Sequence, residues 1–165
     1  MKKLMTIAGV LMIAGTSFAA APGLSGLNLR LGLFYPTDGD TRDFTSDMWF
    51  TGGFDYKLKD MAMGNTSQMG YSIGLSVDWQ ESDEVRAIPV LVTLTSQSMN
   101  GIYWTGGAGV SFNHAPGYNK TKFSFMFGAG YEWKSGMNPI SFEVRYFGNG
   151  DSELSGIGAY VGFRI

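Results

Sequence analysis

The chain has 165 residues, of which 16% are charged and 15% are aromatic, and its formal net charge is −2 at pH 7. This length suits one domain, and the high aromatic content excludes a disordered polypeptide. Cysteine is absent and histidine occurs once, which excludes disulfides, a lipoprotein anchor, cysteine nucleophiles and multi-histidine metal sites. The mildly acidic balance gives no support to nucleic-acid binding.

The N-terminal segment has the pattern of a secretory signal. Lys2 and Lys3 precede an uncharged apolar run over 4–15, and Ser17 and Ala19 supply the small residues that a signal peptidase reads. The apolar run is shorter than the roughly 20 residues that a membrane-spanning helix needs. We therefore expect a signal peptide over 1–19 and a mature domain over 20–165.

From Ser25 onward, apolar and polar residues alternate with the period of two that is typical of β-strands. No later stretch approaches about 18 consecutive apolar residues, so the pattern predicts no transmembrane helix. Pro89 cannot donate a ladder hydrogen bond, and we expect a bulge or a strand end there. The alternating runs cover 27–35, 48–58, 69–79, 87–94, 103–112, 123–134, 140–146 and 157–165.

The connections between these runs are short. We expect loops over 37–47, 80–85, 114–121 and 148–154 at one end, and turns over 59–67, 96–101 and 135–139 at the other. Short loops argue against an adhesin or receptor that acts through its loops. The acidic segment 38–43 lacks the spacing and the closing Glu of a calcium loop, so it is predicted to be an ordinary turn.

The two faces of the predicted strands differ in charge. The apolar face carries essentially no charge, with Arg86 as the one candidate exception. A charge that faces lipid at the midplane costs about 2–4 kcal/mol, whereas a soluble barrel could not bury the opposite face as its core. The charges of that opposite face are Arg30, Asp55, Lys57, Asp78, Glu132, Lys134, Glu143, Arg145 and Arg164.

Aromatic residues of the apolar face gather near the strand ends, as in the belts at bilayer interfaces. We expect one belt with Tyr35, Phe50, Trp79, Phe112, Phe123 and Tyr146, and a second with Tyr56, Tyr71, Trp104, Trp133 and Phe163. The sequence therefore predicts an all-β fold: a closed, antiparallel, up-and-down transmembrane β-barrel of about eight strands, with both termini on the periplasmic side.

The C-terminal segment 158–165 alternates hydrophobic residues and resembles the assembly signal of outer-membrane barrels. Segments 88–90, 106–110 and 142–146 are similar to segments of the outer-membrane β-barrel superfamily, and the mature chain resembles its small eight-stranded members of the OmpA and OmpX kind. The resemblance implies a Gram-negative cell outer membrane, contact with lipid and lipopolysaccharide, assembly by the barrel-assembly machinery through the last strand, and a monomer. Many members end in Phe, whereas this chain ends in Ile165.

A barrel of eight strands is only wide enough for its interior to be filled by side chains. We therefore expect Arg30, Asp55, Lys57, Asp78, Glu132, Glu143, Arg145 and Arg164 to form a structural polar network in the lumen. The pairs Arg30–Asp55 and Glu132–Arg145 are expected to lie diagonally across neighbouring strands. Several glycines on the same face leave a narrow water path or a small cavity as an alternative to complete filling.

Catalytic machinery is not evident in the sequence. Outer-membrane lipid deacylases use a His and a Ser on the barrel exterior, but His114 is predicted in a solvated loop and Ser111 on the lumen face. We expect no catalytic residue, cofactor or metal, and a structural or membrane-barrier role. The alternatives are surface binding or adhesion through the loops, a narrow porin-like pore, and a lipid-modifying enzyme.

Overall fold

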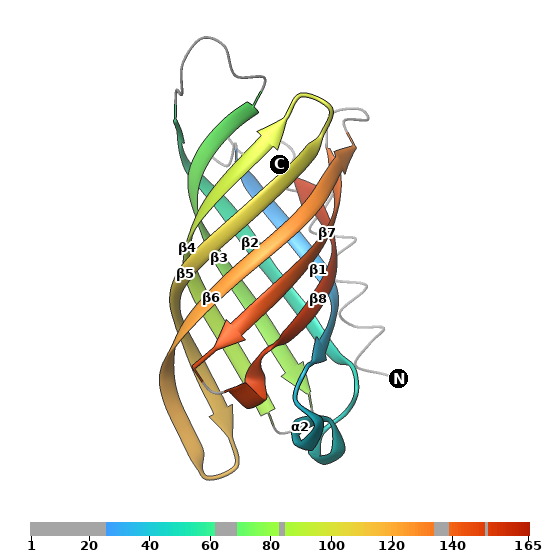
Figure 1. Ribbon diagram of the computed structural model, residues 1–165, viewed down its shortest axis with the longest axis vertical. Coiled ribbons are helices and arrows are strands. Elements are labelled where there is room, and N and C mark those ends of the chain that lie inside the picture. Colours follow the sequence, from blue (N-terminus) through green and yellow to red (C-terminus); the bar gives the residue numbers. More distant parts are fainter. Residues whose placement is uncertain (1–25, 62–68, 83–84, 134–138, 151) are drawn as a thin grey trace.

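The computed structural model describes residues 26–61, 69–82, 85–133, 139–150 and 152–165. The predicted signal peptide and Lys134 lie outside these residues. Eight antiparallel strands form a closed barrel in which each strand pairs with the next along the chain, and the first strand also pairs with the last (Figure 1). The predicted fold, a closed up-and-down barrel of eight strands, is confirmed.

The strands are longer than the alternating runs. They are β1 (Leu27–Pro36), β2 (Trp49–Met61), β3 (Met69–Ser82), β4 (Val85–Ser98), β5 (Ile102–Ala115), β6 (Tyr118–Trp133), β7 (Ile140–Asn149) and β8 (Gly156–Arg164). A short helix, α2 (Gly39–Phe44), follows β1, and a 3₁₀ turn, η1 (Ser152–Leu154), precedes β8. Among the described residues, no helix has the length and apolar character needed to cross a membrane.

Two predicted loops are wrong because they are mostly strand. The segment 80–85 belongs largely to β3 and β4, and the ladder of β5 with β6 continues out to Ala115↔Tyr118, within the predicted loop 114–121. These strand ends carry polar residues on both faces, so apolar and polar residues do not alternate there and the sequence gives no strand pattern. The β5–β6 hairpin turns at Gly117, whose φ of +74° suits glycine.

The two ends of the barrel differ. One end, here called the terminus end, holds Gly26 and Ile165, where the Gly26 amide donates to the Ile165 carbonyl over 3.2 Å. The other, here called the helix end, holds α2 and the β5–β6 hairpin (Figure 1). Since successive strands are antiparallel, the first predicted aromatic belt lies near the helix end and the second near the terminus end.

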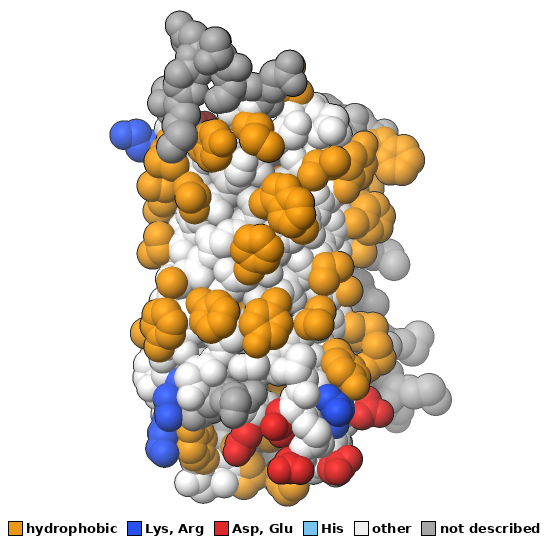
Figure 2. Space-filling model, viewed as in Figure 1, with side chains coloured by type: hydrophobic (Ala, Val, Ile, Leu, Met, Phe, Trp, Pro, Cys, Tyr) orange, Lys and Arg blue, Asp and Glu red, His pale blue; other side chains and the backbone are white. Residues whose placement is uncertain are grey.

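Side chains alternate between the outer wall and the interior. In β8, for example, Tyr160 is buried and Val161 is exposed, and in β3 Asp78 is buried beside the exposed Trp79. Figure 2 shows hydrophobic side chains spread over the barrel wall, while most charged side chains of that view gather at the helix end. The predicted assignment of apolar residues outside and charged residues inside therefore matches the burial pattern of these strands.

Pro89 does not interrupt its strand, so the expected bulge or strand end is wrong. β4 runs from Val85 to Ser98, and its ladder with β5 keeps one register through Pro89↔Ser111. On the other side, pairing with β3 reaches Val77↔Val90 and resumes at Gln80↔Ala87 without a shift. The strand thus accommodates the missing amide by a local gap in one ladder.

Bulky apolar side chains fill the interior at the helix end. Phe34 and Trp49 are fully buried with ring centroids 5.6 Å apart, and Phe147 packs on Phe34 and on Tyr160. We call this cluster the apolar plug; it comprises Phe34, Trp49, Val85, Ala87, Leu91, Met126, Phe147, Leu154 and Tyr160.

Candidate functional site in the barrel interior

Arg30 of β1 lies at the centre of a buried ion-pair network. Its Nη1 is 2.6 Å from Oδ2 of Asp55, and its Nη2 is 2.9 Å from Oδ1 of Asp78. Nη1 is also 3.8 Å from Oε2 of Glu143. The side chains of Arg30 and Asp78 are fully buried, so these contacts are shielded from water.

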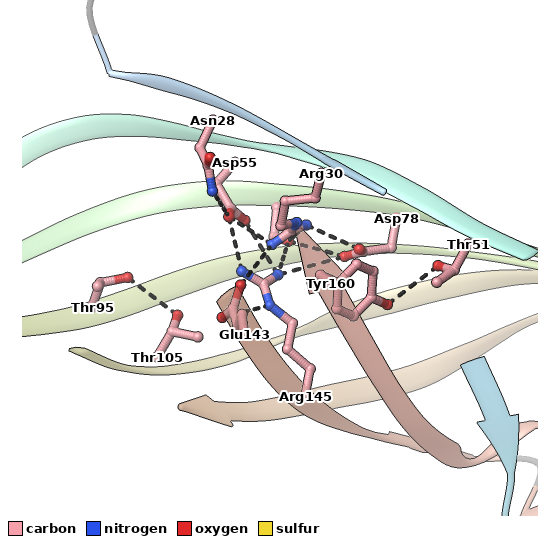
Figure 3. A network of polar contacts seen from close by, with 11 residues as sticks. Asn28, Arg30, Thr51, Asp55, Asp78, Thr95, Thr105, Glu143, Arg145 and Tyr160 are labelled. Carbon is pink, nitrogen blue, oxygen red and sulfur yellow. Dashed lines mark hydrogen bonds and ion pairs between the residues drawn. The ribbon is translucent and has the colours of Figure 1, made fainter. Parts of the chain in front are cut away.

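Arg145 of β7 enters the same network from the opposite wall (Figure 3). Its Nη2 is 2.8 Å from Oδ2 of Asp55, and its Nε is 2.7 Å from Oε1 of Glu143. Ser76 accepts a hydrogen bond from each guanidinium and donates one to Asp78 over 3.1 Å. We call this group the central network; it comprises Arg30, Asp55, Ser76, Asp78, Glu143 and Arg145.

Glycines of neighbouring strands make room for these long side chains. A Cβ at Gly128 would lie 2.8 Å from Cγ of Arg145, and one at Gly53 would lie 2.8 Å from Oδ1 of Asp78. At these positions the space left by glycine is occupied by a neighbouring side chain, so glycine here increases the filling of the lumen.

Tyr160 joins the central network to the apolar plug. The guanidiniums of Arg30 and Arg145 lie 5.4 and 5.9 Å from the centroid of its ring, within the range of cation–π contacts. Its hydroxyl is hydrogen-bonded to Thr51 Oγ1 over 3.2 Å. Charged and apolar layers of the interior therefore form one continuous packed unit.

Three predicted lumen residues lie outside the central network. Glu132 accepts from Gln97 and pairs with Arg164, whose Nη1 is 2.6 Å from Oε2. Lys57 is exposed near the terminus end and pairs with Asp60 over 3.0 Å.

The strand register decides which of the two expected diagonal pairs forms. Asn28↔Asp55 and Arg30↔Gly53 are neighbours in the β1–β2 ladder, so the Arg30–Asp55 contact lies on the expected diagonal. The expected Glu132–Arg145 diagonal is wrong, because Arg145 is opposite Gly128 and Glu132 is opposite Ser141, one inward position too far away.

A polar cavity of about 500 Å³ occupies the interior between the central network and the terminus end. We call it the vestibule. Asp55 and Arg145 of the central network line it, together with hydroxyl and amide side chains of β1, β3, β4 and β5. The interior thus has three layers, which are the apolar plug, the central network and the vestibule.

His114 lies on the outer wall near the helix end. The prediction of a loop position is wrong, because His114 belongs to β5. Its side chain is exposed. Its Nδ1 is hydrogen-bonded to Oδ1 of Asn119, and its neighbour across the ladder with β4 is Arg86. Ser111 points inward and donates to Asn113, so it does not pair with His114.

Arg86, the candidate exception to an uncharged outer face, lies near the helix end. Its guanidinium lies 5.1 Å from the ring centroid of Trp79, whose Nε1 donates to Glu81 over 3.0 Å. The position and the aromatic contact explain how a cation is accommodated on this face.

The acidic segment 38–43 forms a capped helix and not the predicted turn. Asp38 is the N-cap of α2, and its Oδ1 accepts hydrogen bonds from the amide and the hydroxyl of Thr41. The carboxylate therefore satisfies one of the amide groups that the first helical turn leaves without partners.

No protein-family profile and no curated protein matches the chain. Among solved structures it is similar to the crystal structure of the outer membrane enzyme PagL, with a TM-score of 0.46 and 12% sequence identity. The alignment covers 84% of this chain and 98% of that chain. A likeness at this level concerns the fold and says nothing about activity.

Proposed function

We propose that the chain is an outer-membrane protein whose barrel spans the lipid bilayer as a non-conducting structural and barrier element. The observation that carries the proposal is the double closure of the lumen. The apolar plug fills the helix end, and the central network crosses the middle of the barrel from β1, β2 and β3 to β7. Ions would have to pass both layers.

The outer wall supports a location in lipid. Large apolar side chains such as Phe123, Val92 and Trp133 project from it with 62%, 57% and 61% of their surface exposed. Apolar surface in water is unfavourable by about 25 cal/mol per Å², so a wall of this kind calls for an apolar surrounding. Each of the eight strands also pairs with two neighbours in the closed barrel, as a bilayer requires.

The same proposal includes the cellular context. After cleavage of a signal peptide over 1–19, the mature domain would be inserted by the barrel-assembly machinery, which would read β8. The barrel would then contact lipid and lipopolysaccharide as a monomer. The exposed alternation of Ile157, Val161 and Phe163 in β8 supports recognition of this strand by an apolar partner.

Planar-bilayer recording tests the closure of the lumen. Insertion of the purified barrel is expected to produce no discrete conductance steps at neutral pH, because the plug and the central network both lie across the lumen. A matched recording with a known porin in the same bilayers controls for insertion. Regular unitary steps from this protein would establish the pore alternative.

Lipid modification is a second candidate function, favoured by the outward position of His114 next to Arg86 and Asn119. A histidine at the level of lipid headgroups could act as a base, but the partner of His114 among the described residues is the side-chain amide of Asn119, which is not a nucleophile. Mass spectrometry of lipid A is therefore expected to give the same spectrum with and without expression of the protein. If expression of the protein removed an acyl chain from lipid A, and the His114→Ala variant did not, the enzyme would be established instead.

A further inference from the structure

The vestibule is larger than a sealing function requires. A plugged barrel needs no internal cavity, yet about 500 Å³ next to the central network is not filled by side chains. This volume lies within the range of about 300–1,000 Å³ that small-molecule sites occupy. Lys57, Gly70, Ser98 and Arg164 line it near the terminus end, so this is the side from which a ligand would enter.

The vestibule wall is rich in hydroxyl and amide groups. Ser72, Thr93, Thr95, Gln97 and Thr105 line it from three adjacent strands. Thr95 donates to Thr105 over 3.1 Å, as Figure 3 shows, which leaves acceptor positions of Thr105 available. Groups that both donate and accept hydrogen bonds match a ligand that carries several hydroxyls.

One buried polar atom of the lining, Oδ1 of Asn28, has neither a hydrogen-bond nor an ion-pair partner among the described residues. Asn28 is 8% exposed, so bulk water does not reach this atom freely. A buried polar atom retains its desolvation penalty until something bonds to it, and a hydroxyl group of a ligand would donate the missing hydrogen bond.

The charges of the lining are already paired. Asp55 bonds to Arg30 and Arg145, and Lys57 bonds to Asp60. Arg164 bonds to Glu132. A charged ligand would have to displace one of these partners, whereas an uncharged ligand would not.

From this geometry we propose that the vestibule binds a small, uncharged, polyhydroxylated molecule of the saccharide class, which enters from the terminus end. Hydroxyl groups of the ligand meet the threonine and amide side chains of the wall, and the central network forms the floor. This proposal goes beyond the structural role and is independent of it. The plug and the central network close the barrel whether or not the vestibule is occupied.

Calorimetric titration of the full-length mature barrel tests the proposal. The protein is placed in phospholipid nanodiscs, since glycosidic detergents would compete for the site. Glucose and maltose are the neutral probes, and glucose 6-phosphate and glucosamine are their charged counterparts. At least one neutral sugar is expected to bind saturably, and its charged counterparts about tenfold more weakly.

Two glycines provide matched variants. A Cβ at Gly70, on the vestibule wall, would lie 3.9 Å from the backbone carbonyl oxygen of Gln97. A Cβ at Gly106, on the outer wall, has similar room. Gly70→Phe is expected to abolish sugar binding, and Gly106→Phe to leave it unchanged. Replacing Thr95 and Thr105 together with valine removes the hydroxyls at nearly constant volume and should weaken binding about five- to tenfold.

Each other outcome overturns the proposal. Absence of saturable binding by both neutral sugars would mean that the vestibule holds water only. Equal binding by Gly70→Phe and the unaltered protein would place the sugar elsewhere. Tighter binding of either charged counterpart would exclude an uncharged ligand class. Conductance of the same purified protein, recorded separately in planar bilayers, reports on the closure of the lumen and not on the sugar site.

Discussion

Replacing Arg30 with methionine is expected to lower the free energy of unfolding by about 3–5 kcal/mol, the range for removing one member of a buried ion pair. Arg30 and Arg145 together face three carboxylates, those of Asp55, Asp78 and Glu143. The variant leaves a single guanidinium among the three. Repulsion between the buried carboxylates then adds to the loss of the 2.6 and 2.9 Å contacts of Arg30.

The measurement is urea unfolding of the barrel in phospholipid vesicles, followed by the gel shift between folded and heated samples. Lys57→Met is the matched control, because Lys57 was predicted in the same lumen set but forms an exposed pair with Asp60. Its effect should stay within about 0–1 kcal/mol. Adding Asp78→Asn to Arg30→Met removes one surplus carboxylate and should restore part of the loss. Equal effects of Arg30→Met and Lys57→Met would refute a stabilising central network.

The fold was predictable because a period of two recurs in each of the eight strands. The outer wall is continuous and apolar, so each strand carries the same signal independently of its neighbours. Strand ends were less predictable, since the hairpin of β5 and β6 extends through polar residues such as Asn113 and Lys120, which show no contrast between faces.

The pairs inside the barrel were only partly predictable. Arg30 and Asp55 lie on adjacent strands, and their contact follows from a short connection and a diagonal. Arg145 and Asp55 are separated by 90 residues and meet across the lumen, which no local pattern reveals. The predicted partner of Glu132 was wrong. Glu132 lies one inward position too far along β6 to reach Arg145, and it pairs with Arg164 instead.

The apolar plug was indicated in the sequence by large apolar residues on the inward face, but the charges elsewhere on that face drew the prediction towards a polar lumen. Phe34, Trp49 and Phe147 occupy the face that otherwise carries charges. Each lies near the helix end of its strand, where antiparallel order brings the three together. Large apolar residues on the lumen face of several strands at the same end therefore indicate a plug and not an error in the alternation.

Arginine at position 92 should test the membrane location as directly as any single change. Val92 lies in the middle of β4, projects outward with 57% of its surface exposed, and is opposite Leu75 and Ala108 on the adjacent strands. In a bilayer, Val92→Arg would place a charge near the midplane and should lower the free energy of unfolding in vesicles by about 2–4 kcal/mol.

The control for this variant is Thr121→Arg, at an exposed outward position of β6 near the helix end, opposite Phe112. A charge at the interface costs about 0–1 kcal/mol, so the difference between the two variants measures the depth of the wall in lipid. Nearly equal effects, together with a barrel that stays in solution without detergent, would mean that the wall faces water. The apolar surface of the wall would then need a protein partner to cover it.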